Sequence, residues 1–489
     1  MKFKVAGILK RGALILAVVL LTFLAVRTWD KQRGPPLAPW HTQVPPELSG
    51  AQLRDAGWDE WLAAEEAAFA DVRENVTAKL EGVQRNPANR YFDGSPLHAA
   101  RFTHDWNRSY VLEPDARPAG VVVLLHGLTD SPYSLRHVAR HYRDRGWLAL
   151  GIRLPAHGTV PAALARVDWQ DWMAATHLAV REARGRADPA VPFHVVGYSN
   201  GGALAMKYAL DALEDPALAR PDRIVLISPM IGVTAFARFA GVLGWPAAIP
   251  AFAKAAWLGI EPEYNPFKYN SFPVNAARQS SLLSRALQAQ ILDAAEEDRL
   301  AGLPPVITFQ SVVDATVSVD AIIAALYAHL PANGSELVLF DINRQAKFGL
   351  ALRPESAAAL GRLLPAEPRR YRTAVISNAG ADSGEAVEQV TEPGEVASLS
   401  RPLGLNYPFG VFSLSHVAVP FPVSDGLYGL EPDPGEDFGI RLGALALRGE
   451  RGVLITSQEA LTRLQSNPFF PYLLERIDEG IDASAATQP

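Results

Sequence analysis

Between residues 121 and 317, short apolar runs alternate with helical stretches, and this alternation constrains the fold more than any other feature. Runs typical of buried strands lie at 121–127, 148–158, 193–202, 223–230 and 304–317. Helical patterning fills the gaps between the first three runs, and a further helix, "GALAMKYALDALE", follows the third. Strands that are apolar on both faces and separated by helices form a parallel sheet with helices on both sides. The sequence therefore predicts a mostly parallel α/β domain within residues 107–489.

Two longer segments interrupt this alternation. Residues 231–302 are far longer than one crossover helix requires, and we expect an inserted helical cap there. This segment is rich in aromatic residues, namely Phe236, Phe239, Trp245, Phe252, Trp257, Tyr264, Phe267, Tyr269 and Phe272. Residues 344–410 form a second expected insertion. Its stretch 382–395 holds five acidic and no basic side chains and is predicted to be a solvated loop.

The N-terminal 30 residues contain an apolar segment. Residues 12–26 form an uncharged run of 15 residues, with Lys10 and Arg11 before it and Trp29 after it. The run alone covers about 22 Å, short of the roughly 30 Å hydrocarbon core, but snorkelling by the two cations would add residues 5–9 to the span. We predict an uncleaved single-pass anchor over residues 1–30. The cationic N-terminus would then be cytoplasmic and the body would lie outside the cytoplasmic membrane, in the periplasm or the extracellular space.

Two other interpretations of this segment stay open. A signal peptide has an apolar region of similar length, and its cleavage would release a secreted protein. Against cleavage, Phe23-Leu24-Ala25 places phenylalanine where a small residue is required. The segment could also be a core helix buried in the body.

Charge and cysteine content exclude several classes of function. The net charge is −6, and residues 1–33, with seven basic side chains and one acidic side chain, contribute +6, so the remainder carries −12. An acidic body argues against a nucleic-acid partner. The chain has no cysteine, which excludes disulfides, thiolate metal sites, a cysteine nucleophile and a lipoprotein anchor.

Residues 31–106 form an N-terminal extension between the anchor and the α/β domain. Residues 31–50 contain five prolines and are predicted to be a linker. Residues 51–82 carry helical patterning, with apolar side chains on one face and Glu65 interrupting that face. We expect this helical part to pack on the body or to lie close to the membrane.

The pentapeptide Gly197-Tyr198-Ser199-Asn200-Gly201 matches the G-x-S-x-G pattern and makes Ser199 the candidate nucleophile. A strand leads into it and a helix leads out of it. A serine on such a strand-to-helix turn needs small neighbours, because the backbone is strained and side chains would clash there. Its hydroxyl would stand at the carboxyl edge of the sheet, beside the N-terminus of the following helix.

A serine hydroxyl needs a base to remove its proton, and the base needs a carboxylate to orient it. After Ser199 the expected order is acid, then histidine. His416, in a loop before prolines, is the candidate base, whereas His329 ends a helical stretch. Asp314 follows the strand "PPVITF", begins a loop and is the candidate acid. The rival acids are Asp320 and Asp341.

A tetrahedral intermediate also needs two hydrogen-bond donors for its oxyanion. We expect the backbone N–H groups of Asn200 and Leu128 to supply them. Leu128 lies in the loop "HGLTDSPYS" that follows the first strand. The neighbouring His126, and His157 in "LPAHG", are expected to support their loops rather than to take part in chemistry.

With these residues in place, the sequence resembles the α/β-hydrolases, in particular the branch that holds monoacylglycerol lipases, bacterial carboxylesterases and serine aminopeptidase-like hydrolases. The matching pieces, which cover about 120–317 and 410–425, are "VVVLLHGLTDSPYS", "GIRLPAHGTVPAALARVDWQDW", "VVGYSNGGALA", "IVLISPMIG", "SVVDATV" and "SLSHVAVPF". The resemblance implies the triad Ser199, Asp314 and His416, the donors Leu128 and Asn200, and a cap after Met230.

This sequence departs from the family pattern in two places. Ser311 stands where the family's acid loop usually has glycine, three positions before the aspartate. The acid and the histidine are also 102 residues apart, whereas a helix, a strand and two connections need only about 30 residues. Either "SELVLFDIN" leads directly to the histidine, with 344–410 as an insertion, or "RTAVISNAG" adds a strand.

The predicted function is hydrolysis of a carboxylic ester, small or lipid, through an acyl-enzyme, with no metal or cofactor. A peptidase or amidase with the same triad is an alternative, and an aminopeptidase would need a carboxylate for the substrate ammonium, for which Glu261 and Glu263 are candidates. A non-catalytic envelope scaffold on the same fold is the alternative of another class.

Overall fold

A ten-stranded sheet forms the centre of the protein. The structure is a computed structural model that describes residues 2–232, 244–314, 316–347, 363–366, 368–443 and 463–486. The strand order is β1-β3-β2-β4-β5-β8-β9-β10-β11-β12. The seven strands from β3 to β10 pair in parallel, while β1, β11 and β12 pair antiparallel at the two edges. The mostly parallel sheet predicted from the apolar runs is thereby confirmed.

The strands of this sheet are short and the main helices separate them along the chain. The sheet strands are β1 (Tyr110–Leu112), β2 (Val121–Leu125), β3 (Leu148–Ile152), β4 (Phe193–Tyr198), β5 (Arg223–Ile227), β8 (Val306–Ser311), β9 (Glu336–Phe340), β10 (Arg372–Asn378), β11 (Glu385–Thr391) and β12 (Leu399–Asn406). Two small pairs add β6 (Trp257–Gly259) with β7 (Phe272–Pro273) and β13 (Ser413–Leu414) with β14 (Arg463–Leu464). The helices are α1 (Lys2–Arg33), α2 (Pro39–Thr42), α3 (Gly50–Asp55), α4 (Trp58–Asn75), α5 (Arg136–Asp144), α6 (Trp169–Gly185), α7 (Asn200–Glu214), α10 (Val274–Glu296), α11 (Val319–Ile322) and α14 (Phe470–Ala486).

Helices cover both faces of the sheet, as the continuous apolar strands require. Successive side chains of β2 point to opposite faces. Val121 and Val123 belong to one core, which they share with α6, α7 and α10, whereas Val122 and Leu124 belong to a second core with α5 and α14. The two cores explain why the central strands are apolar throughout instead of alternating.

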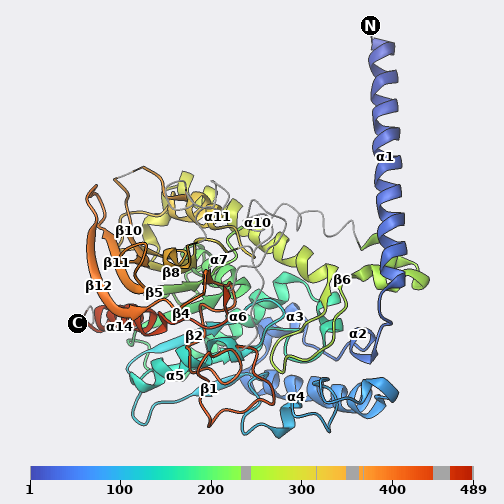
Figure 1. Cartoon of the computed structure of the whole chain (residues 1–489), viewed down its shortest axis with the longest axis horizontal. Coiled ribbons are helices and arrows are strands. Elements are labelled where there is room, and N and C mark those ends of the chain that lie inside the picture. Colours follow the sequence, from blue (N-terminus) through green and yellow to red (C-terminus); the bar gives the residue numbers. More distant parts are fainter. Residues whose placement is uncertain are drawn as a thin grey trace.

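The helix α1 projects away from the body (Figure 1). It spans 32 residues, which corresponds to about 48 Å, and the segment Lys10–Arg33 has the length and apolar composition of a membrane-crossing helix, with a mean hydropathy of 2.1. Only 6% of that apolar window is buried, so the interpretation of this segment as a core helix is wrong. The chain therefore has one apolar N-terminal helix, long enough for an anchor and also compatible with a signal sequence.

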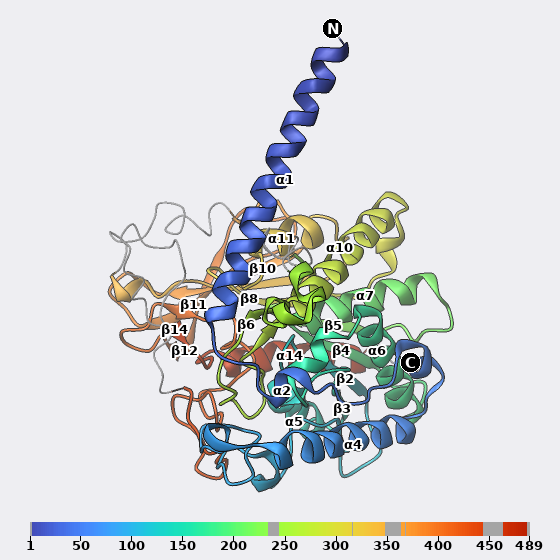
Figure 2. The same ribbon diagram turned by 90° about the vertical axis from the view of Figure 1, so that its right-hand side faces the viewer.

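The N-terminal extension packs closely on the body. Trp40 and His41 of α2 are buried, so the proline-rich segment predicted as a linker is instead folded against the domain. The helix α4 lies along the side of the body opposite the free end of α1 (Figure 2). Glu65, which interrupts the apolar face of α4, is buried and pairs with Arg153, which follows β3.

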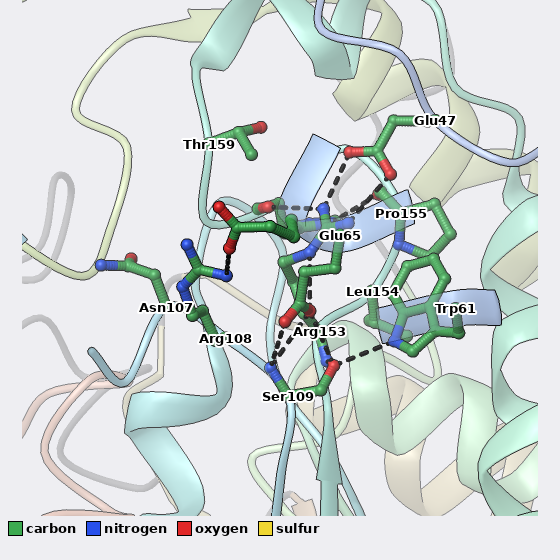
Figure 3. Close-up of polar contacts among 12 residues, drawn as sticks. Glu47, Trp61, Glu65, Asn107, Arg108, Ser109, Arg153, Leu154, Pro155 and Thr159 are labelled. Atoms are coloured by element: carbon green, nitrogen blue, oxygen red, sulfur yellow. Dashed lines mark hydrogen bonds and ion pairs between the residues drawn. The ribbon is translucent and has the colours of Figure 1, made fainter. Parts of the chain in front are cut away.

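Arg153 holds the extension through a buried network (Figure 3). Its guanidinium donates to Glu65 at 3.0 Å and to both carboxylate oxygens of Glu47 at 2.8 and 3.0 Å. The Ser109 hydroxyl donates to Glu65 and accepts the indole N–H of Trp61 at 3.0 Å. The Arg153 side chain is fully buried, so the network fixes residues from three segments of the chain in one position.

The second predicted insertion extends the sheet. The strand β10 is parallel to β9, which favours the alternative in which "RTAVISNAG" adds a strand, and β11 and β12 follow it. The prediction that 382–395 is a solvated loop is wrong for half of this stretch, because Glu385–Thr391 form β11. Glu388 of this strand is fully buried and pairs with Arg372 and Arg401, while Tyr472 of α14 donates to it. Two arginines from the neighbouring strands β10 and β12 thus neutralise Glu388, which the sequence pattern indicated to be exposed to solvent.

The described part of the cap lies between β5 and β8 in sequence. It comprises two short 3₁₀ helices, η6 (Trp245–Ala248) and η7 (Pro250–Ala256), the β6–β7 pair and the long helix α10. Of the aromatic residues predicted for the cap, Phe236 and Phe239 lie outside the described residues. Phe267 and Tyr269 are buried and belong to the body's cores.

Candidate functional site

Ser199 lies between β4 and α7 in a strained backbone conformation, with φ at +54°. Its glycine neighbours are required by close backbone contacts. A Cβ on Gly197 would lie 2.3 Å from the carbonyl oxygen of Gly201, and a Cβ on Gly201 would lie 1.9 Å from the carbonyl oxygen of Leu125. No side chain fits at either position, so the glycines allow the sharp turn that presents the Ser199 hydroxyl.

The structure brings the three predicted triad residues together. The Nε2 atom of His416 is 3.0 Å from the Oγ atom of Ser199, and its Nδ1 atom is 2.7 Å from Oδ2 of Asp314. The Asp314 side chain is fully buried and that of His416 is 7% exposed. This arrangement lets the carboxylate orient the imidazole while the other ring nitrogen accepts the serine proton.

Asp314 is held in its ionised form by its surroundings. Burial by itself would raise the pKa of this carboxyl, but His416 and the donors around it outweigh burial and lower the pKa below its usual value. These donors are the amide of Gln310, at 2.9 Å, and the backbone N–H groups of Thr316 and Val317, at 2.7 and 3.1 Å.

Ser311, the departure from the family pattern, links the two loops of the triad. Its hydroxyl donates to the carbonyl of Leu414 at 3.0 Å, two residues before His416. Arg463 donates to the same carbonyl at 2.8 Å. These bonds join the end of β8 to the loop that carries His416. They bring the acid and the base together although 102 residues, including the additional strands, separate them in sequence.

The rival candidates lie elsewhere. Asp341 bonds to Arg344 and Ser377, and Asp320 is an exposed residue of α11. His329 follows the helical segment that begins with α11 and is half-buried. Of the candidate acids and histidines that follow Ser199 in sequence, Asp314 and His416 are therefore the two that contact each other and the serine.

The predicted oxyanion donors come from two loops that meet at the cavity of Ser199. Asn200 is the first residue of α7, so its backbone N–H has no acceptor within its own helix. Leu128 follows β2 and lines the same cavity as Ser199. The Asn200 side chain is buried and accepts a hydrogen bond from the Ser280 hydroxyl of α10, at 3.2 Å, so it ties the serine turn to the cap.

His126 and His157 support their loops, as expected. His126 Nε2 accepts the backbone N–H of Leu154 at 3.0 Å, and its Nδ1 lies 2.9 Å from the carbonyl oxygen of Gly127. His157 Nδ1 lies 3.0 Å from the carbonyl oxygen of Pro155. Burial lowers the pKa of both imidazoles, to about 4 for His157, so both remain neutral at physiological pH.

Ser199 and His416 open into a cavity of about 410 Å³. Its wall is mainly apolar. The residues that line it are Gly127, Leu128, Thr129, Tyr198, Ser199, Met230, Leu258, Lys268, Phe272, Ala277, Ser280, Thr316 and His416. The cap contributes Leu258, Lys268, Phe272, Ala277 and Ser280, and so it forms the outer wall over the serine.

Asp130 was not singled out by the sequence analysis, although it lies in the quoted loop "HGLTDSPYS". It is 5% exposed and accepts the backbone N–H of Ser131 at 2.9 Å. Burial raises the pKa of Asp130 to about 6, against the opposing effect of Lys268. The acidic residue was visible in the sequence, but its burial beside the cavity was not.

We expect Asp130→Asn to remove part of the pH dependence of stability. Because the folded pKa is raised, the contribution of Asp130 is fully present below its unfolded pKa of about 4 and is lost as the pH rises through about 6. The wild type should therefore lose on the order of 3 kcal/mol of unfolding free energy from this group between pH 4 and pH 8. Denaturant unfolding at both pH values measures the loss, with the exposed Asp55→Asn as control. An equal loss in Asp130→Asn and wild type would contradict the assignment.

Comparisons with known proteins agree with this architecture. Residues 116–330 match the family model described as serine aminopeptidase, S33. The "Thermostable monoacylglycerol lipase" of Bacillus sp. (strain H-257) is 33% identical over 92 residues, which are 19% of this chain and 35% of the relative. The chain thus aligns with about a third of the length of this curated relative.

Solved structures similar to this chain include lipolytic enzymes. The metagenome-derived enzymes described as LipS and LipT give 23% identity over 48% of this chain and 87% of theirs, with a TM-score of 0.38. A monoglyceride lipase from Saccharomyces cerevisiae gives 14% identity over 48% of this chain and 82% of its own, with a TM-score of 0.36. The mostly parallel sheet shows the α/β-hydrolase fold, and residues 116–330 are similar in sequence to the serine aminopeptidase S33 family.

Proposed function

We propose that this protein is a membrane-anchored serine hydrolase that cleaves carboxylic esters through an acyl-enzyme. The observation that carries the proposal is the continuous line of contacts from Asp314 through His416 to Ser199 at the wall of an apolar cavity. A buried carboxylate, an imidazole and a serine hydroxyl in this order are the groups that acyl transfer requires.

The reaction proceeds in two similar halves. His416 Nε2 takes the proton of the Ser199 hydroxyl as the oxygen attacks the ester carbonyl, and the ionised Asp314 stabilises the imidazolium that forms. The backbone N–H groups of Leu128 and Asn200 donate to the oxyanion. His416 then protonates the leaving alcohol, and a water molecule, deprotonated by the same imidazole, releases the acid. The expectation that no metal or cofactor is needed stays a prediction.

The cavity favours an ester over the amino terminus of a peptide. Lys268 lines it, and a cation there would repel the substrate ammonium of an aminopeptidase. The two glutamates considered for holding that ammonium do not line the cavity. Glu263 is buried and accepts the backbone N–H groups of Asn270 and Ser271, while Glu261 is exposed. The apolar wall suits an acyl chain, in keeping with the lipolytic relatives.

We expect short-chain p-nitrophenyl esters to be turned over and aminoacyl p-nitroanilides to be turned over at least about a hundredfold more slowly, since the described residues that line the cavity include a lysine and no carboxylate. Release of p-nitrophenol and of p-nitroaniline by the same enzyme preparation measures the ratio. Turnover confined to the anilides would contradict the ester proposal and favour the peptidase.

The helix α1 carries the proposed anchor. Its apolar segment lies outside the body, and the cationic side chains Lys10 and Arg11 precede it, which favours a cytoplasmic N-terminus with the hydrolase on the other side of the membrane. Release of a secreted form after cleavage is the alternative. N-terminal sequencing of the mature protein distinguishes the two.

A further inference from the structure

The last turns of α1 are fastened to the cap by hydrogen bonds in both directions. Arg27 donates to the carbonyls of Ala255 and Trp257, at 3.1 and 3.2 Å, and Lys31 donates to the carbonyl of Leu258 at 2.6 Å. In the opposite direction, Lys254 of η7 donates to the carbonyl of Gln32 at 3.2 Å. The base of α1 is therefore joined directly to the cap segment that includes η7 and β6.

This fastening leaves an apolar surface beside the helix. We call the three exposed side chains Trp29, Ile249 and Phe252 the cap shoulder; they are 69%, 55% and 37% exposed. A groove runs between α1, which contributes Trp29, and the cap segment that carries Ile249 and Phe252. The residues that line the groove are Leu21, Leu24, Ala25, Thr28, Trp29, Gln32, Pro246, Ile249 and Phe252. Figure 2 shows the lime-coloured cap segment against the base of α1.

The position of the groove along α1 indicates how deep the cap shoulder would lie in a bilayer. Leu21 and Leu24 belong to the apolar run at residues 12–26, and Ile249 and Phe252 border the same groove. If that run lies in a bilayer, the shoulder lies at the level of its last turns, where Trp29 is typical of the interface. Apolar side chains gain free energy when they enter the headgroup–acyl boundary at this depth.

We propose that the cap shoulder inserts into the membrane surface, that a lipid acyl chain occupies the groove, and that ester substrates reach Ser199 from the bilayer side. The strand β6 connects the base of α1 with the catalytic cavity. The Leu258 carbonyl accepts the bond from Lys31, and the same residue lines the catalytic cavity together with Phe272. One residue of the cap, Leu258, thus contacts both the base of α1 and the catalytic cavity. The inference rests on the proposed membrane anchoring of α1 and on the proposed ester substrate.

The absence of native cysteine allows a direct measurement of depth. Phe252→Cys carries an environment-sensitive fluorophore in the full-length chain, reconstituted into phosphatidylcholine–phosphatidylglycerol vesicles, and lipids spin-labelled near the headgroup are the quencher. Val83→Cys is the matched control, since Val83 is 92% exposed on the extension. We expect quenching of about twofold or more at position 252 and none at 83, because only the shoulder lies at the interface. No quenching at 252, or failure of the chain to float with the vesicles, overturns the proposal.

A second measurement tests the route of the substrate. We expect Ile249→Ser and Phe252→Ser to lower hydrolysis of a long-chain ester embedded in vesicles by about tenfold while leaving hydrolysis of soluble p-nitrophenyl acetate unchanged. Equal rates on the embedded ester would overturn entry from the bilayer. If the wild type hydrolysed neither ester, the proposed function would fail, whereas the quenching result would still decide whether the shoulder contacts lipid.

Discussion

Replacing Ser199 with alanine is expected to lower kcat for p-nitrophenyl ester hydrolysis by about 10⁴–10⁶-fold, because the acyl-enzyme cannot form without the hydroxyl. His416→Ala should give a loss of similar size. Asp314→Asn should cost about 10⁴-fold, since the amide would favour the wrong tautomer of His416 while the 2.7 Å contact is retained. Initial rates at saturating substrate measure all three.

Asp320→Asn is the control that shows whether the loss of activity in Asp314→Asn is specific to the triad carboxylate. Asp320→Asn alters an exposed carboxylate that lies six residues after Asp314, and it should leave kcat within about twofold of the wild type. Thermal unfolding of each variant excludes loss of the fold as the cause. If Ser199→Ala retained a substantial fraction of the activity, or if Asp320→Asn lost as much as Asp314→Asn, the triad would be wrongly assigned.

The second large effect is expected at the network that joins the N-terminal extension to the body. Arg153→Met should lower the free energy of unfolding by about 3–5 kcal/mol, because it leaves Glu65, which is 3% exposed, as a buried and unpaired charge. The double variant Arg153→Met with Glu65→Met should recover part of that loss, since the deeply buried charge is removed and only Glu47, which is 16% exposed, is left without its partner. Denaturant unfolding measures both.

Arg108→Met is the control for this prediction. Arg108 pairs with Glu66 at 2.7 Å, but the two side chains are 28% and 55% exposed, so the loss should stay near 0–1 kcal/mol. A loss for Arg153→Met no greater than that for Arg108→Met would show that the extension is not fastened through Arg153.

Much of the catalytic domain could be predicted because it depends on local patterns. The apolar runs that became β2 to β5 and β8 are continuous in sequence, and the glycines beside Ser199 reflect a steric requirement of one turn. The same holds for Asp314, which follows a strand whose carboxyl end reaches the sheet edge where the serine turn lies. Short-range features such as these identify both the elements and the site candidates.

The parts that could not be predicted depend on contacts between residues far apart in sequence. Glu65 looked like a break in an apolar helix face, because its partner Arg153 is 88 residues away. Glu388 looked solvated, because Arg372 and Arg401 reach it only when β10, β11 and β12 align. The fastening of α1 to the cap joins residues more than 200 positions apart, and no spacing rule indicates it.

The measurement that tests the central claim most directly is covalent labelling with a fluorophosphonate, which reacts with a serine only where a base and an oxyanion site activate it. The wild type should be labelled on one residue, and mass spectrometry of the digested protein should place the adduct on Ser199. Ser199→Ala should not be labelled, while Asp320→Asn should be labelled like the wild type. Equal labelling of wild type and Ser199→Ala would contradict the assignment of Ser199 as the nucleophile.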